Sequence, residues 1–195
     1  MRKAGSGTGV LEPGWKMYVV TALFAAVICV TAPFSVPFGP VPLSLATFSV
    51  LLASYVLGPL YGTLAAGVYL LLGAAGVPVF SGFEGGIQKL TGPTGGYLAG
   101  YLALAFAAGL SEIPAGSRKP AVSFLVRMGG AAAGTAILYA FGTAWFTAVS
   151  GTDFRAALGL CVFPFIPGDL VKAAAAAIAA PLLKRALQKA GFRPA

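Results

Sequence analysis

Long apolar runs, separated by short clusters of glycine and proline, dominate this sequence. Hardly any charged residue falls inside the runs, and a transmembrane helix needs about 20 consecutive, mostly apolar residues to cross the hydrocarbon core. Glycine and proline mark the ends of the runs because both residues interrupt helices. The pattern predicts six membrane-spanning helices, at residues 16–33, 43–58, 60–76, 93–111, 120–149 and 168–187.

These helices predict one all-α domain, a polytopic membrane protein built as a six-helix bundle over residues 16–190. We expect residues 1–15 to form a flexible leader and residues 191–195 to form a C-terminal tail. The first apolar run is interpreted as a retained helix rather than a signal peptide, because no small-residue cleavage site precedes a soluble domain.

Composition supports the membrane interpretation and excludes several kinds of chemistry. Apolar residues make up 58% of the chain, charged residues 9%, and the mean hydropathy is +0.88. Histidine and asparagine are absent, which excludes histidine-based zinc sites, Ser/His dyads and histidine proton relays. We therefore expect no metal and no cofactor. Cys29 and Cys161 stand among apolar residues and are expected to be buried thiols, with a disulfide as the alternative.

The distribution of lysine and arginine predicts the orientation. Segments on one side of the predicted bundle hold nine of these residues, whereas loops on the other side hold Lys89 and Arg155. The positive-inside rule then places both termini in the cytoplasm of a multi-pass protein in a bacterial or archaeal cell membrane. The net charge of +8 thus reports topology rather than a nucleic-acid partner, since no basic patch is interleaved with aromatic residues. The nine are Arg2, Lys3, Lys16, Arg118, Lys119, Lys184, Arg185, Lys189 and Arg193.

The most polar interruption of the apolar pattern is the glycine-rich segment from residue 83 to residue 101. It contains Glu84, Gln88 and Lys89 close together. Polar groups and irregular backbone at membrane depth are tolerated only where they line a cavity walled by protein. The segment therefore predicts a binding site.

Two predicted helices begin beside this segment on the outer side. In the fourth, Thr91 or Gly92 is the expected cap and Pro93 the first helical residue. The positive ends of the fourth and sixth helices, together with Lys89 and Lys172, favour an anionic group such as a ligand carboxylate.

Asp169 and Lys172 are the second group of candidates. They stand three residues apart and therefore share one helical face. An acid in the first turn is also favoured by the helix dipole alone. Lys172, however, is followed by an apolar run, and an ionisable residue at that depth usually faces a cavity or a partner. We interpret the pair as a ligand contact, and Arg127 as a residue that snorkels to the interface.

Small residues recur at spacings of four, which allows helix backbones to approach closely. The glycines concerned are Gly58 and Gly62, then Gly92, Gly96 and Gly100, then Gly130 and Gly134.

The motif G-G-I-Q-K-L-T-G-P-T-G-G-Y-L-A-G-Y, at residues 85–101, resembles the BioY family of biotin transporters. These are substrate-binding (S) components of energy-coupling factor (ECF) importers. The likeness runs from Lys16 to about Leu187. It includes P-F-G-P-V-P-L-S-L-A-T-F before the second predicted helix and F-P-F-I-P-G-D-L-V-K-A before the sixth.

The resemblance implies a six-helix S-component fold with a biotin cavity near the outer face. Asp169 and Lys172 match the family's polar pair, and Thr94 and Tyr97 match its glycine-rich motif. Aromatic residues would cover the bicyclic ring of biotin. The implied substrate-binding set is Asp169, Lys172, Tyr97, Thr94, Gln88, Lys89, Glu84, Gly92 and Phe83, with Phe80 as a further aromatic.

The resemblance also implies the partners. No G-x-x-x-x-G-K-[ST] motif occurs, so ATP would be hydrolysed elsewhere. The family works with a transmembrane (T) component and two ATPase subunits, and Ala22, Ala25 and Ala26 resemble its docking face for the T component. Generic helix packing explains these alanines equally well, and a homo-oligomer stays open.

Two other functions are weighed. The same scaffold could bind a different small vitamin if its polar groups differed. An intramembrane hydrolase would recast Asp169 and Lys172 as an acid and a base. Histidine is absent and the chain has five acidic residues in all, so it offers few groups for acid–base catalysis, which argues against an enzyme.

Overall fold

The computed structural model describes residues 15–37, 41–113 and 119–192. Most of the expected leader, and residues 193–195 of the expected tail, lie outside these ranges. The described chain is mainly helical, as predicted, with one two-stranded antiparallel sheet. Its elements are α1 (Trp15–Thr31), β1 (Ser35–Val36), β2 (Leu43–Ser44), α2 (Ala46–Ala74), α3 (Ile87–Thr91), α4 (Gly95–Leu110), α5 (Pro120–Ser150), α6 (Phe154–Cys161) and α7 (Ile166–Lys189).

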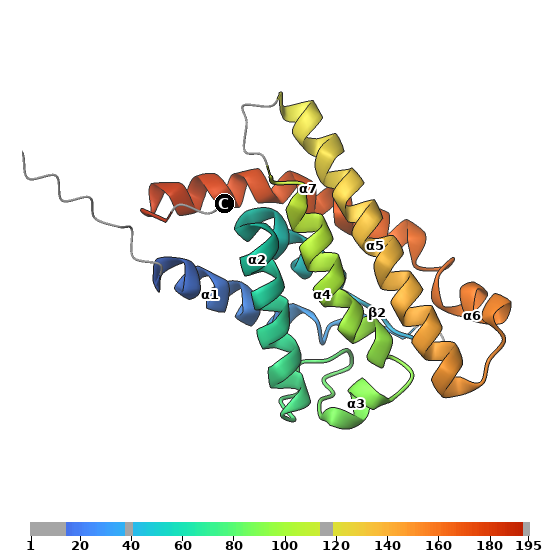
Figure 1. The fold of residues 1–195 in the computed structure, drawn as a ribbon. Coiled ribbons are helices and arrows are strands. Elements are labelled where there is room, and N and C mark those ends of the chain that lie inside the picture. Colours follow the sequence, from blue (N-terminus) through green and yellow to red (C-terminus); the bar gives the residue numbers. More distant parts are fainter. Residues whose placement is uncertain (1–14, 38–40, 114–118, 193–195) are drawn as a thin grey trace, which may run out of the picture.

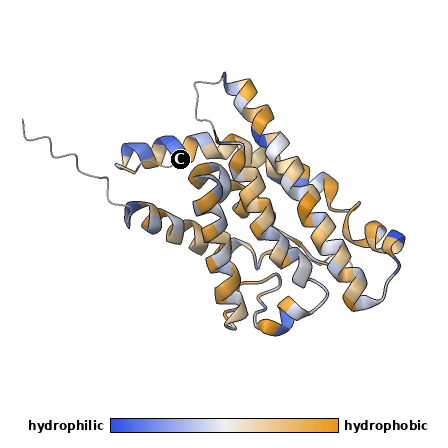
Figure 2. Cartoon of the chain, in the orientation of Figure 1, coloured by the Kyte–Doolittle hydropathy of each residue, from blue (hydrophilic) through white to orange (hydrophobic). Residues whose placement is uncertain are grey.

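The long helices pack around α2. Figure 1 shows α2, α4 and α5 side by side, while α1 and α7 run across their direction and pack against α2. Of the described helices, α2, α5 and α7 are long and apolar enough to cross a membrane, and α1 and α4 are shorter and apolar. In the most apolar 18-residue stretch of each helix, the buried share is 50% in α2, 17% in α5 and 28% in α7. The central position thus belongs to α2, and α5 and α7 present apolar surface outwards (Figure 2).

The helix α2 is broken at Gly58, where the second predicted turn lies. Gly58 has φ 80° and ψ −177°, which is not helical, and Pro59 follows it. A Cβ added to Gly62 would lie 2.7 Å from the Cα of Ser54. Residues eight apart in a straight helix stand about 12 Å apart along the axis. Residues 46–57 and 59–74 therefore fold back on each other, as the predicted segments 43–58 and 60–76 require.

Glycines bring α4 and α5 together. A Cβ on Gly96 would lie 2.7 Å from the carbonyl oxygen of Phe141, and one on Gly134 would lie 3.0 Å from that of Leu104. Gly142 likewise faces the ring of Tyr97. The prediction that glycines at spacings of four allow close packing is confirmed for this helix pair.

Three connections contain structure that the apolar pattern does not predict. The first loop forms the β1–β2 hairpin, the third contains α3, and the fifth contains α6. The side chain of Asp153 caps α6 by accepting a hydrogen bond from the N–H of Arg155 at 3.0 Å. Short elements of this kind lack the long apolar run that reveals a membrane span.

The predicted start of the fourth helix is wrong by two residues. The helix α4 begins at Gly95, whereas Thr91 is the last residue of α3 and Gly92 is extended. Pro93 lies in a turn between the two helices. The carbonyl of Thr94 accepts from the N–H groups of Tyr97 and Leu98, each at 3.1 Å, so Thr94 rather than Thr91 or Gly92 occupies the cap position.

Candidate functional site

Asp169 and Lys172 form a largely buried ion pair at the start of α7. The Lys172 Nζ lies 3.0 Å from Asp169 Oδ1, and the side chains are 11% and 8% exposed, respectively. The pair forms because residues three apart share a helical face. The predicted pairing is confirmed.

Two further elements hold this pair from outside α7. The Lys172 ammonium also donates to the backbone carbonyl of Ser44, at 2.6 Å, which lies on β2. The hydroxyl of Tyr139, on α5, donates to Asp169 Oδ2 at 2.7 Å. Each carboxylate oxygen of Asp169 therefore receives one donor, and three elements meet at the pair.

A small cavity opens beside the pair. It has a volume of about 40 Å³, and its walls include residues of β2, α2, α4, α5, α6 and α7. A neighbouring cavity of about 140 Å³ lies against the glycine-rich segment. The two cavities share Val41, Pro42, Tyr97 and Tyr101 as lining residues, so they form adjoining parts of one site.

The second cavity gathers four of the predicted residues, Glu84, Lys89, Thr94 and Tyr97. Lys89 and Glu84 form an ion pair and are 37% and 50% exposed, which places them at the open side. Phe80 also lines this cavity and is buried. The structure thus brings these residues of the glycine-rich segment together.

Tyr97 stands where the two cavities meet, and its hydroxyl is already engaged. It donates to the backbone carbonyl of Cys161 at 3.0 Å and lies 3.4 Å from the hydroxyl of Thr143. The ring lines both cavities. Tyr97 therefore offers a ligand mainly its aromatic surface.

Three predicted residues line neither cavity. The side chain of Gln88 donates to the carbonyl of Gly85 at 3.0 Å in an exposed segment. The carbonyl of Gly92 accepts from the indole N–H of Trp145 at 2.9 Å. Phe83 is 60% exposed, has a φ of 60°, and packs edge-on against Phe34 with ring centroids 5.5 Å apart.

Phe83 instead borders an apolar groove of about 560 Å³ outside the cavities. Ser44 and Lys172 line the same groove. The positive φ of a bulky residue is uncommon and indicates a locally constrained turn. Phe83 therefore lines this groove and neither of the two cavities.

The three alanines of α1 do not share one surface. Ala25 is 2% exposed and belongs to the core, whereas Ala22 and Ala26 are exposed. Burial of Ala25 leaves Ala22 and Ala26 as the two alanines of this predicted docking face that are open to a partner.

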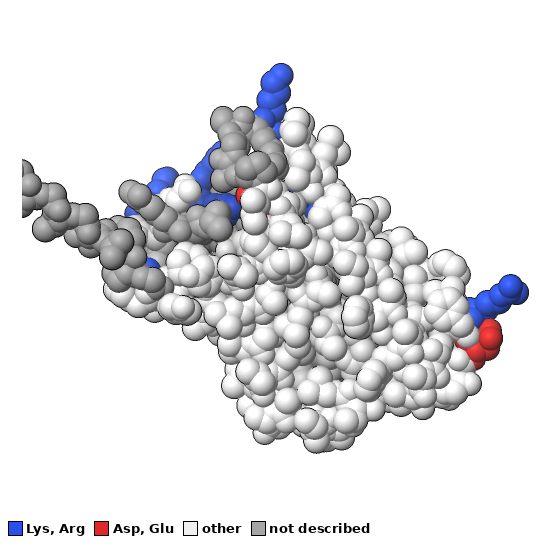
Figure 3. All heavy atoms as spheres, in the orientation of Figure 1, with Lys and Arg blue, Asp and Glu red and all other residues white. Residues whose placement is uncertain are grey.

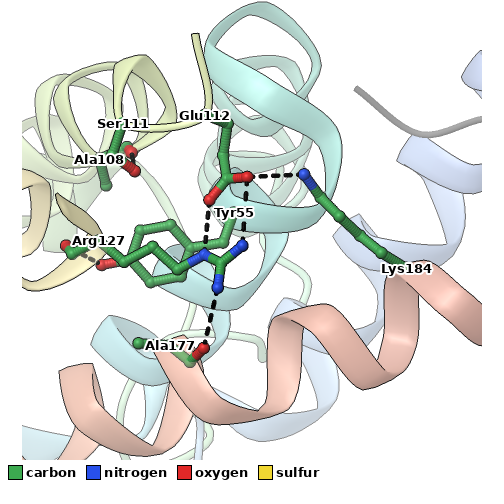
Figure 4. A network of polar contacts seen from close by, with 7 residues as sticks. All are labelled: Tyr55, Ala108, Ser111, Glu112, Arg127, Ala177 and Lys184. Carbon is green, nitrogen blue, oxygen red and sulfur yellow. Dashed lines mark hydrogen bonds and ion pairs between the residues drawn. The ribbon is translucent and has the colours of Figure 1, made fainter. Parts of the chain in front are cut away.

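A second polar cluster lies away from the cavities and joins α2, α5, α7 and the turn that follows α4 (Figure 4). Glu112 Oε1 accepts from Arg127 Nε at 2.7 Å, and Glu112 Oε2 accepts from Lys184 Nζ at 2.7 Å. The hydroxyl of Tyr55 donates to the Arg127 carbonyl at 2.7 Å, and the Arg127 guanidinium donates to the Ala177 carbonyl at 3.4 Å. Arg127 is thus an ion-paired residue rather than one that snorkels alone.

Burial and the two neighbouring cations shift the pKa of Glu112 in opposite directions. Burial raises the pKa of Glu112, but the hydrogen bonds and charges of Arg127 and Lys184 outweigh it and hold the pKa below the ordinary value of 4.5. The carboxylate is therefore ionised at neutral pH, and the cluster carries one net positive charge.

The surface charges gather in few places. In Figure 3, lysine and arginine concentrate where α5 begins and α7 ends, with a small mixed-charge spot over α6 and uncharged surface between them. The Lys184–Glu112 bond places the end of α7 beside the connection that follows α4. Both positively charged segments thus lie at one end of the molecule.

Sequence reasoning missed Tyr139, Ser44 and Glu112. Tyr139 carries a signal, since a phenol inside a long apolar helix needs a hydrogen-bond partner. Ser44 contributes a backbone carbonyl, which no residue type can reveal. Among the described residues, no group of three or more His, Cys, Asp or Glu side chains could hold a metal, and Cys29 and Cys161 are free thiols.

The fold and site define a helical membrane protein that keeps an acid–ammonium pair beside a cavity walled by five of its helices and a hairpin. The chain belongs to the BioY family, whose model matches residues 6–189.

Named relatives match nearly their whole length. The chain is 42% identical over 170 residues to a protein of Thermotoga maritima named biotin transporter BioY, covering 87% of this chain and 96% of the relative. It is also 42% identical over 165 residues to a probable biotin transporter BioY of Pyrococcus horikoshii, covering 85% and 94%.

A solved structure shares the fold. The crystal structure of an S-component for biotin from an ECF-type ABC transporter aligns with a TM-score of 0.77 at 26% identity. The alignment covers 90% of this chain and 94% of that one.

Proposed function

We propose that this chain is the biotin-binding membrane subunit of an ECF importer, which captures biotin at the outer face and delivers it inward. The single observation that carries the assignment of the site is the buried Asp169–Lys172 pair beside the cavity. Two of the three ammonium protons of Lys172 are used, by Asp169 and by the Ser44 carbonyl. One donor remains for a ligand acceptor.

The chemistry of biotin matches the groups in the site. Its ureido ring offers two N–H donors and one carbonyl acceptor, and its side chain ends in a carboxylate. The Asp169 carboxylate can accept an N–H bond, and the Lys172 ammonium can donate to an acceptor. Phe80, Tyr97 and Tyr101 provide aromatic surface for the bicyclic ring.

Several of the predicted contacts receive less support. Glu84, Lys89 and Thr94 reach the cavity and remain in the proposal, with Lys89 available to a ligand carboxylate. Gln88 and Gly92 are bonded elsewhere, so we assign them a role in shaping the loop. Phe83 stands at the outer rim.

The membrane arrangement belongs to the same proposal. Counting the two arms of α2 separately, we propose that residues 16–190 form a six-helix membrane domain, and the charge distribution favours both termini in the cytoplasm. The charged end of the molecule then faces the cytoplasm, and the cavities face outward.

The chain is a transport subunit rather than an enzyme, so its energy comes from partners. We propose a T component and two ATPase subunits as these partners, because the structural neighbour is an S-component of an ECF-type transporter. Ala22 and Ala26 form the exposed small-residue stripe of α1 and are the proposed contact.

Equilibrium binding in detergent tests the proposal. The wild-type chain should bind biotin saturably, in preference to thiamine and riboflavin. Asp169→Asn and Lys172→Met should each weaken binding at least about tenfold, because each removes a hydrogen bond made by a charged group. Lys189→Met is the matched control, since it removes an exposed lysine of the same helix. No saturable binding of biotin, or equal affinity in all variants, would contradict the proposal.

A further inference from the structure

Tyr139 stands at the border between the ligand cavity and a second hollow. A groove of about 240 Å³ runs between α5 and α7, and both Tyr139 and Asp169 line this groove as well as the cavity. Among the described residues that line the groove, the polar side chains are Thr135, Tyr139 and Asp169. The remaining lining is apolar.

The hydrogen bond between the two residues crosses from one helix to the other. The Tyr139 hydroxyl donates to Asp169 Oδ2 at 2.7 Å, while Lys172 donates to Oδ1 at 3.0 Å. The two donors therefore fix both oxygens of the carboxylate. Without the hydroxyl, Oδ2 would border an apolar groove on its α5 side.

We infer that Tyr139 is a positioning residue for biotin recognition, which holds the Asp169 carboxylate in the orientation that accepts a ligand N–H. The inference rests on the proposed function. The single hydroxyl hydrogen of Tyr139 is donated to Asp169 Oδ2. Each carboxylate oxygen keeps a further lone pair that can accept a hydrogen bond from another donor. A carboxylate held at both oxygens has little freedom to rotate, so its remaining lone pairs are preorganised for the ligand.

The identity of the residue fits this role better than a packing role. A phenylalanine would fill the same space between α5 and α7 without a polar atom to satisfy. The ring of Tyr139 is partly buried and packs against the core, and a phenylalanine ring would keep that contact. The hydroxyl is the part of the side chain that the site uses.

The test is a double-mutant cycle on biotin affinity. Tyr139→Phe keeps the ring and should raise the Kd for biotin about tenfold in the wild-type background. In an Asp169→Asn background, the same substitution should change the Kd less than about twofold, because the group that it positions has been altered. Tyr61→Phe is the matched control: its ring packs against Tyr18, away from both cavities, and its Kd should equal that of the wild type.

A spectroscopic reading separates positioning from a general loss of structure. The carboxylate band of Asp169, assigned in biotin-induced infrared difference spectra by its loss in Asp169→Asn, should shift in Tyr139→Phe and not in Tyr61→Phe. A Tyr139→Phe variant with unchanged Kd and an unshifted band would overturn the inference while the wild-type chain still bound biotin. Equal losses of affinity in the two backgrounds would overturn it too. Failure of the wild-type chain to bind biotin would instead reject the proposed function.

Discussion

Glu112 and Asp169 are the two largely buried carboxylates among the described residues, and each is held by cations. Asp169 pairs with Lys172 of its own helix, whereas Glu112 pairs with Arg127 of α5 and Lys184 of α7. A buried charge that loses its partner costs several kcal/mol, so such pairs make the structure sensitive to single substitutions. Asp169 lines the cavity, whereas Glu112 connects α5 and the later part of α7.

Replacing Glu112 by glutamine should destabilise the folded chain by about 3 kcal/mol, because Arg127 and Lys184 would keep their charges with no carboxylate between them. Unfolding in detergent, followed by circular dichroism, measures the loss. Glu84→Gln is the matched control: it breaks the exposed pair with Lys89 and should cost less than about 1 kcal/mol. Equal stability of the two variants would contradict the role given to Glu112.

The same carboxylate predicts a pH dependence. The pKa of Glu112 is lower in the folded chain than its ordinary value of 4.5, so the folded state binds this proton more weakly than the unfolded state. Its contribution is fully present above that value and is lost as the pH falls through the folded-state pKa. Between neutral pH and about pH 3, the wild-type chain should therefore lose more stability than Glu112→Gln. Parallel pH profiles would argue against this ion pair.

At the residue scale, the sequence predicts pairs within a helix better than pairs between helices. The spacing of Asp169 and Lys172 is visible in the sequence, and the structure confirms their bond. Tyr139 stands 30 residues earlier, on another helix, and its bond depends on how α5 and α7 pack. The partners of Glu112 are likewise set by tertiary packing.

At the scale of elements, glycine decides how closely α4 and α5 approach. Both helices are apolar, so hydrophobicity alone does not determine which faces meet in a membrane. The two helices lie so close at Gly96, Gly100 and Gly134 that a side chain there would collide with the neighbouring helix. The contact between α4 and α5 is therefore set by the absence of side chains.

Gly96→Ala should separate α4 from α5 and destabilise the chain by about 1 to 3 kcal/mol, because its Cβ would meet the Phe141 carbonyl and Trp145. Gly129→Ala in α5 is the matched control, since nothing lies within 4 Å of the added Cβ. It should leave stability unchanged or raise it by about 0.5 to 1 kcal/mol through helix propensity. Thermal unfolding of both variants in detergent measures the difference, and similar losses would refute the packing argument.

The apolar pattern predicts the long elements well and the short ones poorly. Predicted bounds for α1, α5 and α7 lie within two residues of those observed, because glycine and proline end these helices. The fold-back at Gly58 is also predicted by the Gly-Pro pair. The helices α3 and α6 and the β1–β2 hairpin are fixed by capping, turns and contacts that hydropathy does not register.

At the scale of the whole molecule, two polar regions occupy different parts of an otherwise apolar bundle. The cavities and the Asp169–Lys172 pair draw on the hairpin, α4, α5 and the start of α7. The Glu112 cluster joins the turn after α4, α2, α5 and the later part of α7. The helix α7 thus contributes to both regions, with Asp169 and Lys172 in the first and Lys184 in the second. The distribution of lysine and arginine along the sequence predicts that the first region faces outward and the second faces the cytoplasm.

Site-directed labelling in right-side-out membrane vesicles tests the central claim most directly. Ser81 lines the larger cavity with Lys89 and Thr94, so a Ser81→Cys chain carries a thiol at the proposed site of entry. The parent chain, with Cys29 partly buried and Cys161 buried, gives the background. A membrane-impermeant maleimide added outside should label the new thiol, and biotin should slow the reaction. Labelling only after the vesicles are permeabilised, or at a rate that biotin leaves unchanged, would contradict the account.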